Sequence, residues 1–461
     1  MRTIVKNGIL VLPPGCCRAD LLIENGKISG IGENPDGTGA EVIDAKGCYV
    51  FPGAIDAHTH MDLQSGPVRA VDDFYSGTVA AAFGGTTTII DHIGFGPKGC
   101  GLHHQIAEYH ELADGKAAID YSFHGVVQDV SDELLEEAAA LAGEGTTSFK
   151  IYTTYDYKLD DAQIYRFLKR AGSCGIVTAF HAENDSLIQY LRSRYVSLGK
   201  TAPIYHAESR PDDCEAEAVS RILHLASAAG GAPVYFVHVS CAKSLAEIQK
   251  ARAMGQKNVF AETCPQYLVL TREEYKRGGG EGLKYIMSPP LRTREDCGAL
   301  WKGLALGQIQ VVATDHCPFN FAKEKQLGKN DFTKCPNGAP GVEERVRLIY
   351  SEGVAQHRIT VGRMAEVLCA NPAKIFGLYP RKGVLLPGSD ADLFLLDPGA
   401  EETLTVSGLH SAVDYTAYEG KRVRGAIPLV MQRGKVLVKG RTFLGTRGGG
   451  QFLKRKKFKG W

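Results

Sequence analysis

The stretch Ala54-Ile55-Asp56-Ala57-His58-Thr59-His60 decides how the fold is interpreted. An apolar run over residues 49–55 leads into two histidines separated by one residue. Side chains at i and i+2 of a β-strand point to the same face, so His58 and His60 could present two imidazoles to one point. Neutral imidazole is a common metal ligand. The same spacing also occurs in unrelated surface or core histidines, so the other ligands must come from elsewhere in the chain.

Apolar, β-branched segments alternate with helical patterns from residue 54 to about residue 345. The eight expected strands cover residues 54–60, 86–91, 119–127, 148–153, 176–182, 234–240, 258–264 and 309–315. Expected helices between them include 71–83, 131–142, 160–171, 214–229, 242–254 and 294–306. Such alternation predicts βα units and a parallel sheet. Eight units favour a closed (β/α)₈ TIM barrel in an α/β fold, with an open doubly wound sheet as the alternative.

Both ends of the chain are rich in short β segments. Residues 3–5 and 9–11 flank Asn7-Gly8, which predicts a hairpin. Residues 430–438 predict another hairpin that resembles 23–31. We therefore expect a small β-sandwich from residues 1–50 and 381–461, with the barrel at 51–380. The basic end, residues 454–459, is interpreted as a solvated, flexible tail in preference to a partner-binding patch.

The composition is that of a soluble globular protein. Of 461 residues, 44% are hydrophobic and 23% are charged, and the formal net charge is +1, which argues against a surface built for nucleic acid or anionic membranes. No apolar run approaches the roughly 20 residues of a membrane helix, and residues 1–8 lack a secretory signal pattern. The 12 cysteines are scattered and typical of reduced thiols. These features predict a cytoplasmic protein.

Polar side chains end several of the expected strands. In a (β/α)₈ barrel the chemistry lies at the C-terminal ends of the strands. Each residue alone has a structural explanation, such as a hydrogen-bonded core histidine or a lysine whose stem covers apolar surface. Together the groups would suffice for zinc or a similar divalent metal. They are His58, His60, Lys150, His181, His238 and Asp315.

Lys150 is the most informative of these residues. An ammonium in an apolar strand beside metal cations would be costly. A neutral amine could instead take up carbon dioxide, and the resulting carbamate has two oxygens that can bridge two metals. Two metals that share a hydroxide lower the pKa of the parent water.

Further motifs resemble the cyclic amidohydrolases, which comprise hydantoinases, dihydropyrimidinases, allantoinases and dihydroorotases. The resemblance spans nearly the whole chain and includes Pro52-Gly53, Gly84-Gly85-Thr86-Thr87, Phe149-Lys150, Thr314-Asp315-His316 and residues 387–393. ETCPQYL at 262–268, SPPLR at 288–292 and NGAPGVE at 337–343 are similar to the hydantoinase/dihydropyrimidinase family. IDHIGFGP at 90–97 and DYSFHG at 120–125 favour its D-hydantoinase members that accept phenyl substituents.

The resemblance implies ring opening of D-5-monosubstituted hydantoins to N-carbamoyl-D-amino acids by a metal-bridging hydroxide. It implies two divalent metals, zinc first among them. One would be held by His58, His60, N6-carboxylated Lys150 and Asp315, and the other by the same lysine with His181 and His238. Tyr155 would stabilise the oxyanion and Asp315 would carry the proton. Ser288 and Asn337 would bind the ring amides, although each also fits a plain turn. A homotetramer with a small cyclic ureide as substrate, and without nucleic acid or membrane partners, is expected.

Several alternatives stay open. Dihydropyrimidinase and allantoinase activities would use the same site, so both stay possible. Dihydroorotase activity is disfavoured, because Met61-Asp62-Leu63 stands where dihydroorotases carry an arginine that binds the substrate carboxylate. Loop 63–66 and three tyrosines within 152–158 are expected to wall a pocket for an aromatic substituent. A scaffold of the collapsin response mediator type would lack the full ligand set. A deaminase on this barrel would need one metal and no carboxylated lysine.

Overall fold

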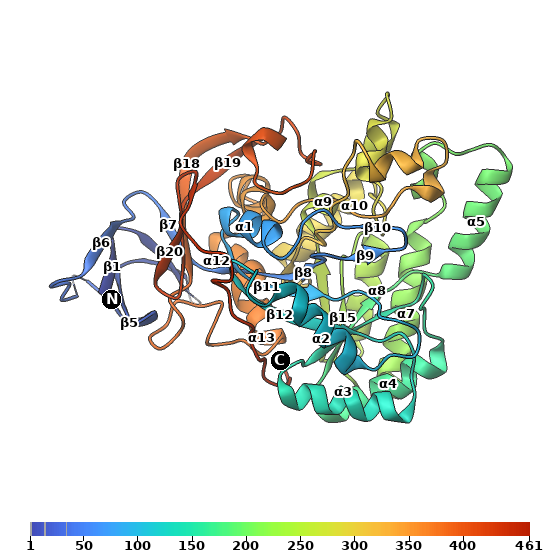
Figure 1. Ribbon diagram of the computed structural model, residues 1–461, viewed down its shortest axis with the longest axis horizontal. Coiled ribbons are helices and arrows are strands. Elements are labelled where there is room, and N and C mark those ends of the chain that lie inside the picture. Colours follow the sequence, from blue (N-terminus) through green and yellow to red (C-terminus); the bar gives the residue numbers. More distant parts are fainter. Residues whose placement is uncertain (1, 13–14, 34) are drawn as a thin grey trace.

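The computed structural model describes residues 2–12, 15–33 and 35–461. Figure 1 shows a barrel surrounded by helices on one side of the molecule and a β-rich domain on the other. In that domain the first strands of the chain, in blue, lie beside the last strands, in red. The two chain ends therefore build one domain together.

Eight parallel strands form the barrel, in the order β17-β16-β15-β14-β13-β12-β11-β8. Their bounds are β8 (Ala54–Thr59), β11 (Thr86–His92), β12 (Asp120–Val126), β13 (Ser148–Tyr152), β14 (Val177–His181), β15 (Val234–Phe236), β16 (Val259–Thr263) and β17 (Val311–Val312). A parallel bridge between Thr59 and His316 joins β8 to the segment after β17. The predicted closed barrel is thus confirmed, and the open doubly wound alternative is wrong.

Helices connect the barrel strands, and the six expected ones are present. The α-helices are α1 (Ser76–Phe83), α2 (Leu102–Ala113), α3 (Asp132–Glu144), α4 (Asp161–Cys174), α5 (Asp185–Ser197), α6 (Ile204–Glu208), α7 (Asp212–Ala228), α8 (Ala242–Ala253), α9 (Pro265–Val269), α10 (Arg294–Ala305), α11 (Arg345–Ile349), α12 (Val361–Ala365) and α13 (Asn371–Ile375). Local chemistry sets their ends. The Asp160 side chain accepts from the backbone N–H of Gln163 at the start of α4, and Gly175 ends that helix in a left-handed conformation with φ 68°.

Short 3-10 or π-helical segments complete the connections. They are η1 (Arg272–Lys276), η2 (Glu281–Tyr285), η3 (Glu324–Gly328), η4 (Phe332–Lys334), η5 (Tyr350–Val354), η6 (Glu366–Ala370) and η7 (Val406–Gly408). The loop between β8 and α1 carries the short hairpin β9 (Gln64–Ser65) and β10 (Val68–Arg69). This loop belongs to the functional end of the barrel.

Two sheets form the β-rich domain around a shared apolar core. One has the order β5-β4-β1-β6 and the other β21-β20-β19-β18-β7-β2-β3. Their bounds are β1 (Arg2–Lys6), β2 (Ile9–Leu12), β3 (Gly15–Arg18), β4 (Asp20–Glu24), β5 (Lys27–Gly32), β6 (Glu41–Asp44), β7 (Tyr49–Pro52), β18 (Leu393–Thr403), β19 (Arg422–Gln432), β20 (Lys435–Lys439) and β21 (Thr442–Phe443). The sandwich is therefore built from both ends, while the boundaries after residues 50 and 380 stay a prediction.

The hairpin expected around Asn7-Gly8 is wrong, whereas the one at 430–438 is confirmed by the antiparallel pair β19–β20. β1 pairs with β4 and β6, and β2 pairs with β3 and β7, so the turn carries the chain from one sheet to the other. A Cβ at Gly8 would lie 2.6 Å from Cγ2 of Val50. This glycine reflects the close approach of β7 and not a chain reversal.

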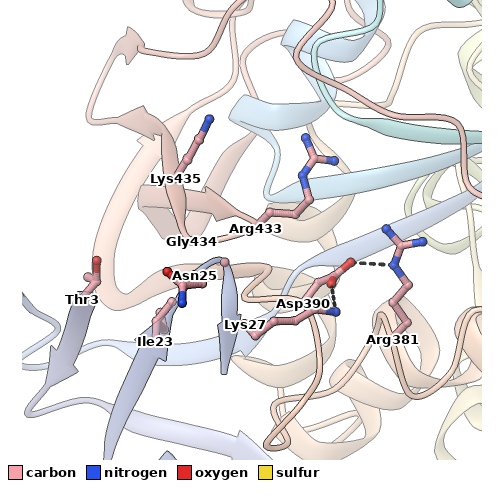
Figure 2. A pocket seen from close by; sticks show the side chains of 10 residues that line it. Thr3, Ile23, Asn25, Lys27, Arg381, Asp390, Arg433, Gly434 and Lys435 are labelled. Carbon is pink, nitrogen blue, oxygen red and sulfur yellow. Dashed lines mark hydrogen bonds and ion pairs between the residues drawn. The ribbon is translucent and has the colours of Figure 1, made fainter. Parts of the chain in front are cut away.

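Buried charges join the sandwich to the barrel. Figure 2 shows Asp390 between Lys27 and Arg381, with which it makes ion pairs, at a cavity of about 470 Å³. Beside it the buried Lys382 Nζ lies 2.6 Å from carboxylate oxygens of both Asp120 and Asp392, and 3.0 Å from Asp390. These ion pairs connect the barrel strand β12 to residues that precede β18.

The basic C-terminal segment is not the flexible tail that its composition suggested. Arg455 is buried and donates hydrogen bonds to Ser122 Oγ at 2.9 Å and Ser148 Oγ at 2.8 Å. Further along, the Phe458 N–H donates to Gly175 O at 2.8 Å. The segment is ordered because its backbone and Arg455 find acceptors on the barrel, which a charge count could not reveal.

The expectation of unpaired thiols is confirmed, since all 12 cysteines are free. Within residues 2–12, 15–33 and 35–461, none of the helices combines the length and apolar character needed to cross a membrane.

Candidate metal centre

One cavity of about 620 Å³ opens at the C-terminal ends of the barrel strands. The side chains that the sequence singled out come from six different strand ends or loops, and the closed barrel brings them together. All nine predicted site residues line this cavity, namely His58, His60, Lys150, Tyr155, His181, His238, Ser288, Asp315 and Asn337.

The first group of ligand atoms consists of His58, His60 and Asp315, whose ligand atoms all lie within 4.8 Å of one another. Asp315 Oδ1 is 3.0 Å from His58 Nε2 and 3.2 Å from His60 Nε2. Ligands that bond a zinc ion at about 2.0–2.2 Å in a tetrahedral arrangement are separated by similar distances. The three side chains therefore fit one metal.

Hydrogen bonds orient both histidines of this group. His58 Nδ1 lies 2.7 Å from Glu262 Oε1, and His60 Nδ1 lies 3.1 Å from the carbonyl oxygen of His92. With Nδ1–H donating in each ring, Nε2 carries the lone pair that faces the cavity. Burial lowers the pKa of His58, but the Asp315 and Glu262 carboxylates outweigh it and raise the pKa to about 9. The negative potential that favours imidazolium would also favour a bound cation.

The second group consists of His181 and His238. Nδ1 of His181 lies 2.9 Å from Nε2 of His238, and Nε2 of His181 lies 2.7 Å from Glu183 Oε2. The same Glu183 oxygen accepts from Arg210 at 2.6 Å. Glu183 thus leaves Nδ1 of His181 free to bind a metal together with His238, as outer-sphere carboxylates do in metal sites.

Lys150 lines the same cavity as both groups and is buried. Burial lowers the pKa of its amine to about 8, although the charges of Asp315 and Glu262 act in the opposite direction. Among the described residues no carboxylate lies within ion-pair distance of its Nζ. A neutral amine in this position suits the carboxylation expected of Lys150.

Three cavity residues have a positive φ although none is glycine: Tyr155 at 73°, His238 at 41° and Asp315 at 56°. Such backbone conformations cost energy and persist only where surrounding contacts hold them. The Asp315 N–H donates to His58 O at 2.9 Å, and the His238 N–H donates to Glu262 Oε1 at 2.9 Å. This last bond also explains why β15 ends at Phe236, before the predicted residue 240.

Sequence reasoning missed the residues that support the ligands. Glu262 accepts from His58, from the His238 backbone and from Tyr235 Oη at 2.7 Å. It sits near the end of the seventh strand, to which no polar group was assigned, so the rule that found the ligands would have found it. Glu183 follows His181 by two residues and is likewise a polar residue near a strand end. No such sequence pattern marks Arg210.

Aromatic rings form one wall of the cavity beyond the ligands. The ring centroid of Phe95 lies 5.2 Å from that of Tyr152 and 4.7 Å from that of Tyr157. Leu63, from the loop after β8, lines the same cavity. The wall is apolar on its faces and polar only at its hydroxyls, which suits an aromatic or aliphatic group.

Comparison with known proteins agrees with this geometry. Residues 49–437 match the amidohydrolase family. The chain belongs to the amidohydrolase family. This amidohydrolase is 48% identical to D-phenylhydantoinase of Escherichia coli O9:H4 (strain HS) over 459 residues, 99% of each chain. The predicted resemblance to D-phenylhydantoinase and its hydantoinase/dihydropyrimidinase family is thereby confirmed.

Solved structures of similar proteins cover this amidohydrolase almost completely. The crystal structure of dihydropyrimidinase from Brevibacillus agri NCHU1002 is 43% identical, with a TM-score of 0.97 and 100% of both chains covered. The structure of D-hydantoinase from Bacillus sp. AR9 is also 43% identical with a TM-score of 0.97, covering 99% of this chain and 100% of the other. The barrel and sandwich are thus shared by proteins named for two different ring substrates.

Proposed function

We propose that this hydrolase of cyclic amides opens D-5-monosubstituted hydantoins to N-carbamoyl-D-amino acids, with aromatic substituents favoured. The proposal rests on the convergence of two histidine groups and the buried Lys150 on one cavity. It is supported by full-length relatives named D-phenylhydantoinase and D-hydantoinase. Dihydropyrimidinase activity is the second candidate, because the similar Brevibacillus agri protein carries that name.

Two divalent metal ions, zinc in the first place, are proposed as cofactors. His58, His60 and Asp315 would hold one and His181 and His238 the other, with carboxylated Lys150 between them. Imidazole nitrogens and carboxylate oxygens are ordinary zinc ligands. When bound, the two metals would supply a water of lowered pKa as the nucleophile.

The residues of the chain have separate tasks in this proposal. Burial raises the pKa of Tyr155, so its hydroxyl stays protonated at neutral pH and can donate to the oxygen of the attacked carbonyl. Burial raises the pKa of Asp315 as well, but His58 and His60 outweigh it and hold the pKa well below its usual range. The ionised carboxylate can take the proton of the nucleophile and pass it to the leaving ring nitrogen. Ser288 and Asn337 would bind the ring amides, chiefly through backbone atoms.

The aromatic wall is proposed to select the exocyclic group. Tyr152, Phe95 and Tyr157 form its rings, and Leu63 faces the same space. Replacing Leu63 by Phe adds an aromatic ring to this wall, so the relative rates on 5-phenyl- and 5-methylhydantoin should change. An unchanged ratio of kcat/KM for these two substrates would contradict this role of the loop.

Ring opening of a small substrate panel by metal-reconstituted protein tests the proposal. The panel contains both enantiomers of 5-phenylhydantoin, 5-methylhydantoin, dihydrouracil and allantoin, each with and without a chelator. We expect chelator-sensitive hydrolysis that is fastest on D-5-phenylhydantoin. A preference for dihydrouracil or allantoin would retain the site and change the substrate, and no hydrolysis of any ring would contradict the proposal.

Metal content separates the remaining alternatives. We expect about two metals per chain, whereas a deaminase would bind one and a scaffold protein none. We also propose a homotetramer, as the resemblance to hydantoinases implies. The mass in solution, measured by light scattering, tests the assembly.

A further inference from the structure

Lys325, on the 3-10 segment η3 (Glu324–Gly328), is completely buried outside the metal centre. Its Nζ donates to three backbone carbonyl oxygens: Ile286 at 2.7 Å, Pro336 at 2.8 Å and Gly338 at 2.6 Å. An ammonium has three donors, and all three are used. Among the described residues no carboxylate lies within ion-pair distance of it. The cation is therefore satisfied by backbone alone.

These carbonyls belong to the two segments that carry Ser288 and Asn337. Ile286 lies two residues before Ser288, while Pro336 and Gly338 flank Asn337 on both sides. The Gly338 N–H donates to Ile286 O at 3.0 Å, so the segments also bond to each other. Both Ser288 and Asn337 line the cavity, whereas Lys325 is not among its lining residues and contacts the two segments from behind.

We propose that Lys325 is a positioning residue that holds the backbone atoms of Ser288 and Asn337 at the spacing that a cyclic ureide requires. The inference rests on the proposed function, because it assigns ring binding to these two segments. A ring with adjacent N–H and C=O groups needs donors and acceptors at fixed separations, and hydrogen bonds to it weaken when these atoms are displaced. One side chain that bonds both segments sets this separation.

The same contact tunes the donor at Asn337. The Pro336 carbonyl and the Asn337 N–H belong to one peptide group. An ammonium at the carbonyl oxygen draws electron density toward that oxygen and makes the N–H a stronger donor. A ring carbonyl would therefore accept a stronger hydrogen bond from this N–H, although it would not contact the ammonium itself.

The packing leaves little room for another arrangement of the segment that carries Asn337. Gly338 has φ +148°, and a Cβ there would lie 2.3 Å from the carbonyl oxygen of Cys317. The segment is thus wedged between Lys325 and the chain that follows Asp315. Loss of the ammonium would remove the Nζ donor from the Pro336 and Gly338 carbonyls and leave Ile286 O with the Gly338 N–H alone, and we expect the segments to move apart to reach water.

Lys325→Met tests the inference, with Lys329→Met as the matched control because Lys329 is exposed just after the same segment. We expect the KM for D-5-phenylhydantoin and dihydrouracil to rise at least tenfold in Lys325→Met. The kcat should stay within about threefold and the two metals should be retained, since loss of uniform substrate binding acts on KM. Amide hydrogen exchange should accelerate in peptides that contain residues 286–288 and 336–338. Lys329→Met should change none of these quantities.

Unchanged KM together with unchanged exchange in these peptides would overturn the inference and leave the proposed function intact. Metal loss with a fall in kcat at constant KM would overturn it as well, because Lys325 would then support the metal centre. If Lys325→Met does not fold, Lys325→Gln retains two donors and should show an intermediate KM; a wild-type KM would contradict the inference. Failure of the wild-type protein to open any ring would instead overturn the proposed function, independently of the exchange result.

Discussion

Replacing Glu262 by Gln probes how far the metal centre depends on a residue that touches no metal. Glu262 is fully buried, and its Oε1 accepts from His58 Nδ1 at 2.7 Å and from the His238 N–H at 2.9 Å. Its Oε2 accepts from Tyr235 Oη at 2.7 Å. Glutamine has the same shape and can keep the first two bonds through its carbonyl oxygen. The substitution therefore removes the charge with little change in packing.

The expected magnitude follows from what the carboxylate does for His58. Hydrogen bonds to a charged acceptor are about twice as strong as neutral ones, and the carboxylate makes Nε2 of His58 a better ligand. Loss of such an outer-sphere partner weakens metal binding about 10- to 100-fold, equivalent to about 1.4–2.7 kcal/mol. The negative charge that helps raise the pKa of His58 is lost too, so its pKa should fall below about 9.

Competition with a chromophoric chelator measures the zinc affinity of wild type, Glu262→Gln and a control. Glu344→Gln is the matched control, since Glu344 is also buried and accepts from Thr416 Oγ1 at 2.7 Å, but lies outside the cavity. Glu262→Gln should lose 10- to 100-fold in affinity for one metal while Glu344→Gln loses little. Equal affinities for wild type and Glu262→Gln would refute the assignment of Glu262 as the orienting partner of His58.

Three further predictions concern other parts of the molecule. Asp315→Asn should lower kcat by several orders of magnitude while the fold is kept, and near-normal turnover would contradict its proton-carrying role. At fixed dissolved carbon dioxide, metal-free protein should bind metal again faster at pH 9 than at pH 7. The reason is that the Lys150 amine becomes neutral as pH rises through its pKa of about 8. Equal rates of metal binding at the two pH values would count against carboxylation. Lys382→Met leaves the buried Asp392 without a cation and removes one of the cations that Asp120 and Asp390 contact, so it should lower the free energy of unfolding by about 3–5 kcal/mol in denaturant titration. A loss under about 1 kcal/mol would show that the junction does not depend on this charge.

The barrel was predictable because its signals are local. Eight apolar segments with helical patterns between them fix the number of βα units, and the closing contact of Thr59 with His316 follows from that number. Strand ends were less predictable. The sixth strand ends where a side-chain contact takes over from the ladder, at His238, whose N–H bonds to Glu262.

The sandwich and the tail show where local signals mislead. Asn7-Gly8 has the composition of a hairpin turn, yet the strands on either side of it do not pair with each other: β1 pairs with β4 and with the distant β6, and β2 pairs with β3 and with the distant β7. The basic tail has the composition of a solvated segment, yet Arg455 bonds to two serines of the barrel. In both cases pairing across long sequence separations overrides local preference, and no local pattern encodes such pairing.

The sequence by itself determined the barrel and nine of the residues that line its cavity. A strand end fixes where a side chain points, and the six polar side chains at five strand ends of one barrel must meet. Only the tertiary structure decided which nitrogen of each histidine faces the cavity and which buried groups orient it. Glu262, Glu183 and Lys325 act on residues far away in the chain, and hydrogen bonds of that kind depend on distances of a few tenths of an ångström that only the packed fold sets.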